Sequence, residues 1–338
     1  MQINKVVSIG EALIDRLGPV GGDPAVDQPA TDCFGGAPAN VACALSRLGA
    51  KVSFVGSLGN DFHGRNFKNL FRERGVNTIG LQQDKSRPTR VVLVRRNEEG
   101  ERFFESFKGD NGSGFADQAI SKNLLIKNWP FVADNAKWLI TGSIPLASPI
   151  SSEAYLCCIK KALDCGMMIA MDLNWRPTFW YGGSTQQIRP SLKEINNIKC
   201  VLRDVALIKL AKEEAEWFFN SSDPNEISSV FSHNPSVIVT DGSRPISWLI
   251  NSHRGISNAI KPTSIVDTTG AGDAFMAGLI YKLLDLDLEQ VTYKIAEDVI
   301  QFANGCGAFV CQGLGAIDSQ PYLVDVESIL SLYKGGMS

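Results

Sequence analysis

Short apolar runs rich in β-branched residues recur along the chain, and segments with helical periodicity separate them. The runs are continuous rather than alternating, which is typical of strands covered on both faces. We predict strands at 6–10, 52–55, 138–141, 168–172, 205–209 and 237–240, and helices at 39–48, 64–74, 151–165, 213–219 and 274–284. Strand, helix and strand in repetition predicts an α/β fold with a mainly parallel sheet and right-handed connections.

Two segments interrupt this rhythm. Residues 12–34 are rich in Gly, Pro and Asp, and residues 88–108 alternate apolar and polar positions around a turn at 97–100, as in a β-hairpin. We predict a small accessory sheet from 12–35 and 87–109, and a main domain from 1–11, 36–86 and 110–338. Such a sheet could act as a lid over the crevice where α/β sheets bind ligands, or it could be an edge hairpin without a role.

Composition narrows the class of partner. The 338 residues carry 33 Lys and Arg against 36 Asp and Glu, with no polybasic run, which argues against nucleic acid and membrane surfaces as partners. No uncharged apolar run reaches the roughly 18 residues of a membrane span. Eight cysteines without a Cys-x-x-Cys pair are typical of small buried side chains in a reducing compartment, so we expect a cytoplasmic protein.

The most specific motif is Asp-Thr-Thr-Gly-Ala-Gly-Asp-Ala-Phe-Met-Ala-Gly at 267–278. Gly270, Ala271 and Gly272 lie where a helix is predicted to begin, so their amides and the helix dipole favour an anion there. Asp273 in the first turn could accept a proton from a hydroxyl that attacks a bound phosphoryl group. The alternative for a bare Gly-x-Gly-Asp is a residue that only caps the helix.

Two further motifs are polar. Gly35-Gly36-Ala37-Pro38-Ala39-Asn40 precedes a predicted helix; its glycines allow close approach to a ligand, and Asn40 can donate and accept hydrogen bonds with sugar-like hydroxyls. In 172–177, Asp172, Asn174 and Arg176 share one side at the carboxyl end of a predicted strand, where Arg176 could bind phosphate oxygens. The alternative for the first motif is a loop in which Asn40 faces solvent. The alternative for the second motif is a salt bridge at the end of the strand. The absence of any Gly-Lys dipeptide excludes a Walker-type phosphate loop.

Together the three motifs resemble the ribokinase-like (pfkB-type) carbohydrate kinase family, over nearly the whole chain from 10–15 to 315–321. Within the family, Gly-Glu-x-Leu-Ile-Asp at 10–15 and Asp-x-Asn-x-Arg-Pro at 172–177 are most similar to fructokinases. The resemblance implies a three-layer α/β/α sandwich with a small β-sheet lid. It also implies transfer of the ATP γ-phosphoryl group to a sugar hydroxyl.

The resemblance also implies roles for individual residues. Asp273 would be the catalytic base beside the anion hole of Gly270, Ala271 and Gly272, with Arg176 at the sugar–phosphate junction. The sugar would be held by Asp15, Gly35, Gly36 and Asn40, with Phe107 and Lys108 from the lid. The nucleotide would contact Asn174, Thr240, Gly242, Gly270, Gly272 and Asn304. Glu214 would act on Mg²⁺ through water, and K⁺ would bind near Asp267 and Thr269.

The chain departs from the family pattern at several of these places. Ala211 stands where Asn or Ser is usual, Pro245 replaces a loop glycine, and Phe107-Lys108 replaces the usual lid pattern, where Lys108 could supply the missing charge. The substrate therefore stays open between fructose and 2-keto-3-deoxygluconate, ribose or a nucleoside. A non-catalytic sugar-binding or regulatory member is a further alternative, and an exposed sheet favours a homodimer through the lid.

Overall fold

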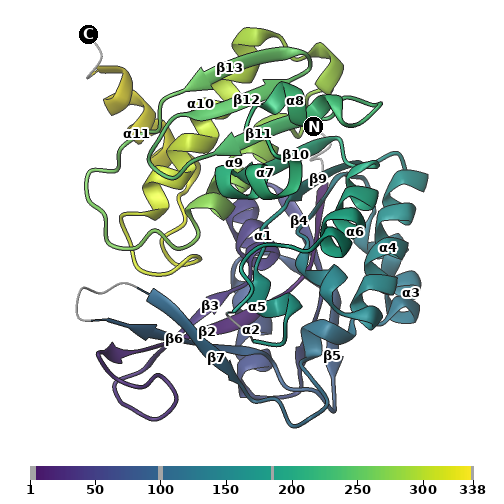
Figure 1. Cartoon of the computed structure of the whole chain (residues 1–338), viewed down its shortest axis with the longest axis vertical. Coiled ribbons are helices and arrows are strands. Elements are labelled where there is room, and N and C mark those ends of the chain that lie inside the picture. Colours follow the sequence, from purple (N-terminus) through teal and green to yellow (C-terminus); the bar gives the residue numbers. More distant parts are fainter. Residues whose placement is uncertain (1–4, 98–101, 184–185, 336–338) are drawn as a thin grey trace.

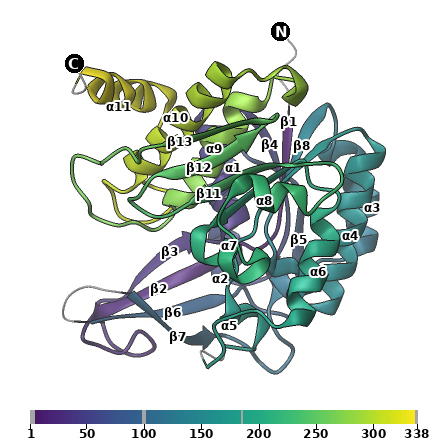
Figure 2. The same ribbon diagram turned by 45° about the horizontal axis from the view of Figure 1, so that its top comes forward.

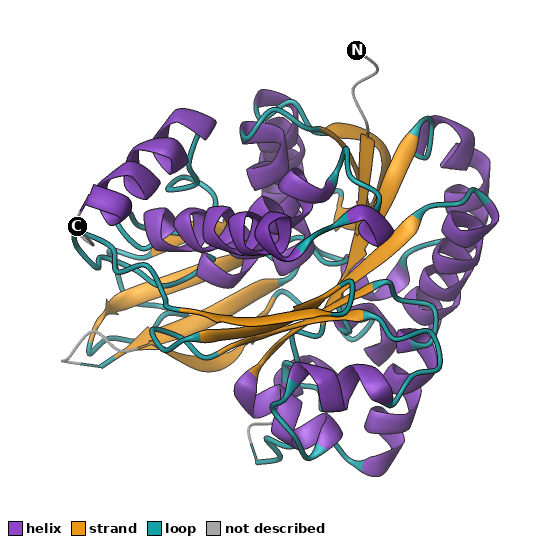
Figure 3. Ribbon diagram, turned by 90° about the horizontal axis from the view of Figure 1, so that it is seen from above, coloured by secondary structure: helices purple, strands orange, loops and turns teal. Residues whose placement is uncertain are grey.

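The structure is a computed structural model that describes residues 5–97, 102–183 and 186–335. Within these ranges, nine strands form one sheet with helices against both faces (Figures 1 and 3). The strands from β11 to β5 are parallel, whereas β12 and β13 extend one edge antiparallel. In spatial order they are β13 (His253–Ser257), β12 (Ile246–Ile250), β11 (Ser236–Thr240), β10 (Leu207–Ala211), β9 (Met168–Asp172), β8 (Ala136–Thr141), β1 (Lys5–Ile9), β4 (Lys51–Gly59) and β5 (Asn77–Asp84).

Two hydrophobic cores lie on opposite faces of this sheet. Consecutive strand residues alternate between them: Val6 and Trp138 belong to one core, Val7 and Leu139 to the other. The first core is covered by α1 (Ala37–Arg47), α2 (Phe62–Glu73), α9 (Ala271–Leu283) and α10 (Tyr293–Val310), with α11 (Leu323–Gly335) against α10. The second is covered by α3 (Lys122–Val132), α4 (Pro149–Asp164), α6 (Leu192–Leu202), α7 (Lys212–Phe219) and α8 (Pro224–Ser229).

A second, smaller sheet projects from the main body (Figure 2). Its order is β3 (Thr31–Gly35), β2 (Leu13–Val20), β6 (Val91–Arg96) and β7 (Arg102–Lys108). β2 and β6 are parallel, while β2–β3 and β6–β7 are antiparallel. The pairing of β6 with β7 confirms the predicted hairpin, although part of its predicted turn, 98–100, lies outside the described residues. The α/β class with a mainly parallel sheet and a small second sheet is confirmed.

Each predicted strand and helix overlaps an observed one, with β10 displaced two residues from its predicted bounds. Prediction missed β5, β12, β13 and several helices, among them the long α10. Short helical turns lie at α5 (Pro177–Trp180), η1 (Ala116–Ala119), η2 (Ile144–Ala147) and η3 (Leu288–Gln290). In the part of the chain that the structure describes, no helix is long and apolar enough to span a bilayer. Of the cysteines, Cys43, Cys158 and Cys306 are buried, as expected, whereas Cys165 and Cys200 are exposed and the other three are partly buried.

Candidate active site

A cavity of about 540 Å³ opens at the carboxyl ends of the parallel strands, beside the small sheet. Eleven of the residues to which the sequence analysis gives a role line it: Asp15, Gly36, Asn40, Asn174, Arg176, Glu214, Thr240, Thr269, Gly270, Gly272 and Asp273. They come from segments as far apart as β2 and α9. The fold therefore gathers the three sequence motifs around one cavity, which is where open α/β sheets bind ligands.

Gly270 determines how α9 begins. It is the N-cap residue, with a left-handed backbone at φ 83°, and a Cβ there would lie 2.6 Å from that of Ala316. Gly270 and Gly272 line the cavity, so the positive end of this helix faces it. Ala271 does not line the cavity, and its amide donates to the Thr268 carbonyl at 3.3 Å.

Asp273 lies in the first turn of α9, and its Oδ2 accepts a hydrogen bond of 2.8 Å from Nδ2 of Asn40. Burial raises the pKa of Asp273 to about 6, and the charge of Asp172 adds to this. The Asn40 hydrogen bond and the charges of Lys209 and Arg176 act in the opposite direction. The carboxyl is therefore ionised at neutral pH yet basic enough to take a proton.

Asp15 of β2 lines the cavity and lies beside the Gly35-Gly36 pair. A Cβ on Gly35 would lie 2.4 Å from Oδ2 of Asp15, so Gly35 touches that carboxylate without lining the cavity itself. Glu11, which follows β1, also lines the cavity, and its Oε1 accepts the Ala37 amide at 3.1 Å. Burial raises the pKa of Glu11 to about 8, with smaller contributions from the charges of Asp117 and Asp273.

The small sheet and α5 form one wall of the cavity, here called the aromatic wall because Phe104 and Phe179 belong to it. Val92 of β6 and Phe104 of β7 line the cavity together with Phe179 of α5. Phe107 lies behind this wall, with ring centroids 4.9 Å from Phe104 and 5.2 Å from Phe179. Lys108 does not line the cavity, and its Nζ donates to the Ala25 carbonyl at 3.3 Å.

Behind Phe107 and Phe179 lies a buried ion pair between Arg90 and Asp117. The guanidinium donates to both carboxylate oxygens, at 2.9 and 3.1 Å. It also lies within 4.7 Å of the ring centroids of Phe107, Phe115 and Phe179. This cluster joins the small sheet to η1 and α5.

The third motif ends β9. Asp172, Asn174 and Arg176 all line the cavity. Strand alternation is not the reason, because β9 ends at Asp172 and Asn174 has a left-handed backbone at φ 45°. Asp172 Oδ2 accepts a hydrogen bond of 2.6 Å from Nζ of Lys209, the residue in register with it on β10. Arg176 is exposed to the cavity, and its Nη1 donates to the Trp175 carbonyl at 3.0 Å.

Glu214 is buried at the start of α7, where its two oxygens accept the amides of Trp175 (2.6 Å) and Ala211 (2.8 Å). Burial raises its pKa, and the charge of Asp172 adds to this. Ala211 lines the cavity through its small side chain, where the family pattern has Asn or Ser. Glu214 therefore ties the loop after β9 to the end of β10.

Most of the remaining residues with a predicted role do not line the cavity. Thr240 lines the cavity, whereas Gly242 does not. Asn304 is buried and holds the adjacent loop, donating to the Asn258 carbonyl at 2.8 Å and accepting the Ile260 amide at 3.0 Å. Asp267 is also buried away from the cavity, where its oxygens accept the amides of Thr269 (3.0 Å) and Gly315 (2.8 Å).

Sequence reasoning missed Glu11 and Lys209, and quoted Asp172 without giving it a role. Glu11 follows β1 and received no role although it stands in the quoted motif at 10–15, and Lys209 lies within β10, outside every motif. The signal that could have found Lys209 is a lysine in the interior of a strand otherwise built from apolar residues, because a buried lysine requires a partner.

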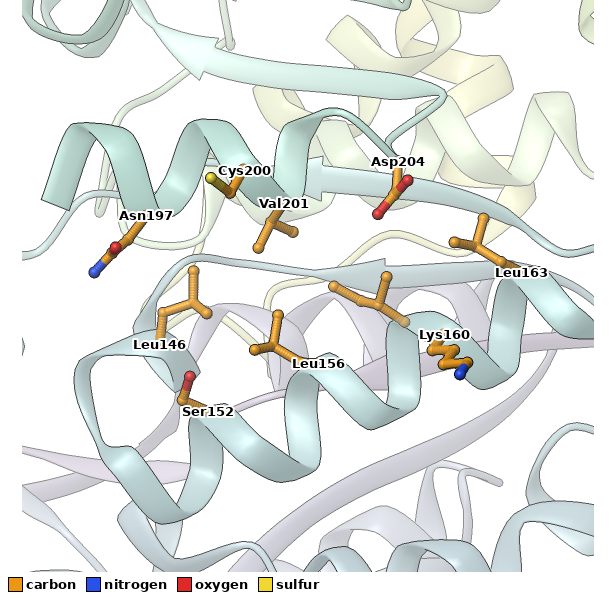
Figure 4. A pocket seen from close by; sticks show the side chains of 10 residues that line it. Leu146, Ser152, Leu156, Lys160, Leu163, Asn197, Cys200, Val201 and Asp204 are labelled. Carbon is orange, nitrogen blue, oxygen red and sulfur yellow. The ribbon is translucent and has the colours of Figure 1, made fainter. Parts of the chain in front are cut away.

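A second cavity, of about 530 Å³, lies between α4 and α6 and is lined by Leu146, Ser152, Leu156, Ile159, Lys160, Leu163, Asn197, Cys200, Val201 and Asp204 (Figure 4). None of the sequence motifs reaches it. The first cavity is therefore the candidate active site.

Comparison with known protein families identifies the chain as a carbohydrate kinase. The family model for pfkB family carbohydrate kinases matches residues 3–323, and the chain belongs to that family. Within the family it is fructokinase-like: it is 33% identical to probable fructokinase-7 of Arabidopsis thaliana over 333 residues, which cover 96% of this chain and 92% of that protein.

Two solved structures are similar along the whole chain. The fructokinase from Xylella fastidiosa with bound ATP has a TM-score of 0.80 and 25% identity, over 98% of this chain and 99% of that one. A double mutant of the fructokinase from Vibrio cholerae O395 was solved with fructose, ADP and a potassium ion. It has a TM-score of 0.79 and 25% identity, over 97% of this chain and 98% of that one.

Proposed function

We propose that this kinase is an ATP-dependent fructokinase, which transfers the γ-phosphoryl group of ATP to D-fructose and forms fructose 6-phosphate. The observation that carries the proposal is Asp273, hydrogen-bonded to Asn40 at the start of α9 in a cavity that Asp15 and Arg176 also line. Asp273 is suited to accept a proton, Asp15 and Asn40 are suited to a sugar, and Arg176 is suited to a phosphate, which supports the proposal.

The reaction follows from that arrangement. Asp273 takes the proton of the attacking sugar hydroxyl as the oxygen–phosphorus bond forms and the bond to ADP breaks. The start of α9 and the Arg176 guanidinium stabilise the negative charge of the transferring group. Asp15 and Asn40 orient the sugar, and Asn174 and Thr240 contact the nucleotide. The aromatic wall with Phe104 excludes water, which would otherwise compete as acceptor.

The residues present fit a magnesium ion that arrives with the nucleotide. Among the described residues, no cluster of three His, Cys, Asp or Glu side chains forms a ready-made metal cage. Mg²⁺ usually keeps several waters and binds through phosphates and one or two carboxylates. When bound, it would neutralise phosphate charge, and Glu214 could accept a hydrogen bond from one of its waters. The loop of Asp267 and Thr269 is the proposed K⁺ site.

The charges of the cavity favour a neutral sugar over an acid sugar. The proposed sugar side carries the carboxylates of Asp15 and Asp273, while Glu11 keeps its proton at neutral pH, because its pKa is raised to about 8. The Arg90 guanidinium behind the aromatic wall is already paired with Asp117. A carboxylate such as that of 2-keto-3-deoxygluconate would be repelled there. Fructose offers hydroxyl groups instead, and both solved relatives described above are fructokinases.

Coupled measurement of ADP release, with Mg·ATP and each of fructose, glucose, ribose, 2-keto-3-deoxygluconate and adenosine, tests the proposal. We expect kcat/KM for fructose to exceed the others by more than about tenfold, the scale of one missing polar contact. A higher value for another acceptor would replace fructose as the substrate. No turnover with any of them, while ATP still binds, would favour a non-catalytic role.

A further inference from the structure

Lys209 is a buried cation that the three motifs do not include. It lies on β10 and is 5% exposed, and its Nζ donates to Oδ2 of Asp172 at 2.6 Å. Burying such a pair costs solvation that the attraction between the charges does not always offset, so stability alone is a weak reason for keeping it. Because Lys209 lines the cavity, we consider a role for it in the reaction.

The ammonium group faces the start of α9. A Cβ on Gly272 would lie 3.4 Å from Nζ of Lys209, and Gly272 immediately precedes Asp273. The charge of Lys209 also lowers the pKa of Asp273, against the effects of burial and of Asp172. Lys209 therefore lies close to both the anion-binding end of the helix and the proposed base.

Lys209 and Arg176 are the two cationic side chains among the described residues that line this cavity. They differ in how firmly they are held. Arg176 is exposed, and its guanidinium donates to the neighbouring Trp175 carbonyl, whereas Lys209 is fixed by a buried carboxylate. A fixed charge costs little reorganisation when charge develops in the transition state.

We propose that Lys209 is a further catalytic residue, whose ammonium donates a hydrogen bond to a non-bridging oxygen of the γ-phosphoryl group during transfer, while Asp172 holds it in place. The sugar oxygen–phosphorus bond forms, the bond from phosphorus to the ADP oxygen breaks, and the hydroxyl proton goes to Asp273. Lys209 keeps its own protons throughout. The assignment rests on the proposed kinase function.

The test compares Lys209→Met with Lys212→Met. Lys212 is a matched control because it is exposed on the neighbouring helix, where it pairs with Asp241 at 3.4 Å. We expect Lys209→Met to lower kcat for fructose about 10²–10³-fold, with the KM for fructose changed less than about threefold. Lys212→Met should keep kcat within about twofold.

A transition-state mimic separates catalysis from folding. Fructose binding is measured calorimetrically with ADP and Mg²⁺, with and without aluminium fluoride, which imitates the transferring phosphoryl group. In the wild-type protein, aluminium fluoride should tighten fructose binding more than about tenfold, and Lys209→Met should lose that gain while binding fructose with ADP alone as before. Full retention of the gain in Lys209→Met would overturn the assignment.

Lys209→Met alone leaves the buried Asp172 carboxylate without its partner, which disfavours folding. The double variant Lys209→Met/Asp172→Asn removes that charge as well and so tests catalysis without this effect. Its kcat should be as low as that of Lys209→Met, and a return to wild-type kcat would show that the lysine only neutralises Asp172. A wild-type protein that neither binds nor phosphorylates fructose would instead contradict the proposed function.

Discussion

At the scale of single residues, Asp273 is governed by opposing influences. Burial and Asp172 raise its pKa, whereas Asn40, Lys209 and Arg176 lower it, and the outcome is a value of about 6. A carboxyl group with an ordinary pKa near 4 would be a weaker base, and one above neutrality would be protonated in most molecules. The surroundings thus bring the pKa of Asp273 to a value at which its carboxylate can act as a base near neutral pH.

The first prediction concerns the ionisation of Asp273. Since the base must be ionised, kcat should rise with pH through about 6 and reach a plateau above it. Asp273→Asn should lower kcat about 10²–10⁴-fold while MgATP still binds. Initial rates between pH 5 and 8 and calorimetric titration with a non-hydrolysable ATP analogue measure both effects. Full activity in the variant would remove Asp273 from the mechanism.

The second prediction concerns Glu11, whose pKa is raised to about 8 by burial. The unfolded chain releases this proton near pH 4.5 while the folded protein retains it, so the contribution of Glu11 to stability falls by about 1.4 kcal/mol per pH unit between those values. Glu11→Gln does not titrate and can still accept the Ala37 amide.

Thermal unfolding of both proteins between pH 4.5 and 9 measures this effect. The Tm of Glu11→Gln relative to wild type should rise as pH increases from 4.5 toward 8, then level off. A Tm difference that does not change with pH would mean that Glu11 is ionised in the folded protein.

At the scale of elements, the start of α9 is the most constrained part of the site. Gly270 combines a left-handed backbone with a close approach to Ala316, so a side chain there meets two penalties. Gly166 offers a control, since its φ of 72° is similar but a Cβ there would meet no atom within 4 Å.

The third prediction compares alanine at these two positions. Gly166→Ala should cost about 1–2 kcal/mol through backbone strain, with kcat unchanged. Gly270→Ala should cost more and should also lower kcat, because the helix start must move away from Ala316. Denaturant unfolding and fructose turnover measure the two effects, and equal kcat values in the two variants would contradict the role of this helix end.

An element could be predicted from the sequence when the residues that determine it are close together in the chain. The glycine-rich starts of α1 and α9 and the polar end of β9 were evident in the sequence, because turn and cap residues act over a few positions. The antiparallel β12 and β13 were missed because their short segments lack a clear alternation. The partners of Lys209 and Glu11 could not be recognised from the sequence, because they are distant in the chain. Lys209 donates to Asp172, and Glu11 accepts a hydrogen bond from the Ala37 amide.

At the scale of the whole molecule, the strand order and the way the small sheet joins the main body were beyond sequence reasoning. Both depend on pairings between distant segments, such as β1 between β4 and β8. The Arg90–Asp117 pair is one such connection, linking the small sheet to η1 and, through Phe179, to the cavity wall. Both side chains are 3% exposed.

The fourth prediction tests that connection. Asp117→Asn leaves the Arg90 charge buried without its partner, so the free energy of unfolding should fall by about 3–5 kcal/mol. Glu105→Gln is the control, since the Arg95–Glu105 pair on the same sheet is partly exposed and should leave Tm nearly unchanged. Denaturant unfolding and Tm measurements compare the two, and equal effects would mean that the buried pair does not hold the small sheet in place.

The central claim is that this cavity transfers a phosphoryl group from ATP to fructose. The most direct test follows one mixture of the wild-type protein, Mg·ATP and fructose by ³¹P NMR, beside an identical mixture with Asp273→Asn. The account predicts that ADP and fructose 6-phosphate accumulate in equal amounts with the wild-type protein, and far more slowly with the variant. Phosphorylation of another position, release of inorganic phosphate in place of a sugar phosphate, or equal rates in the two samples would contradict it.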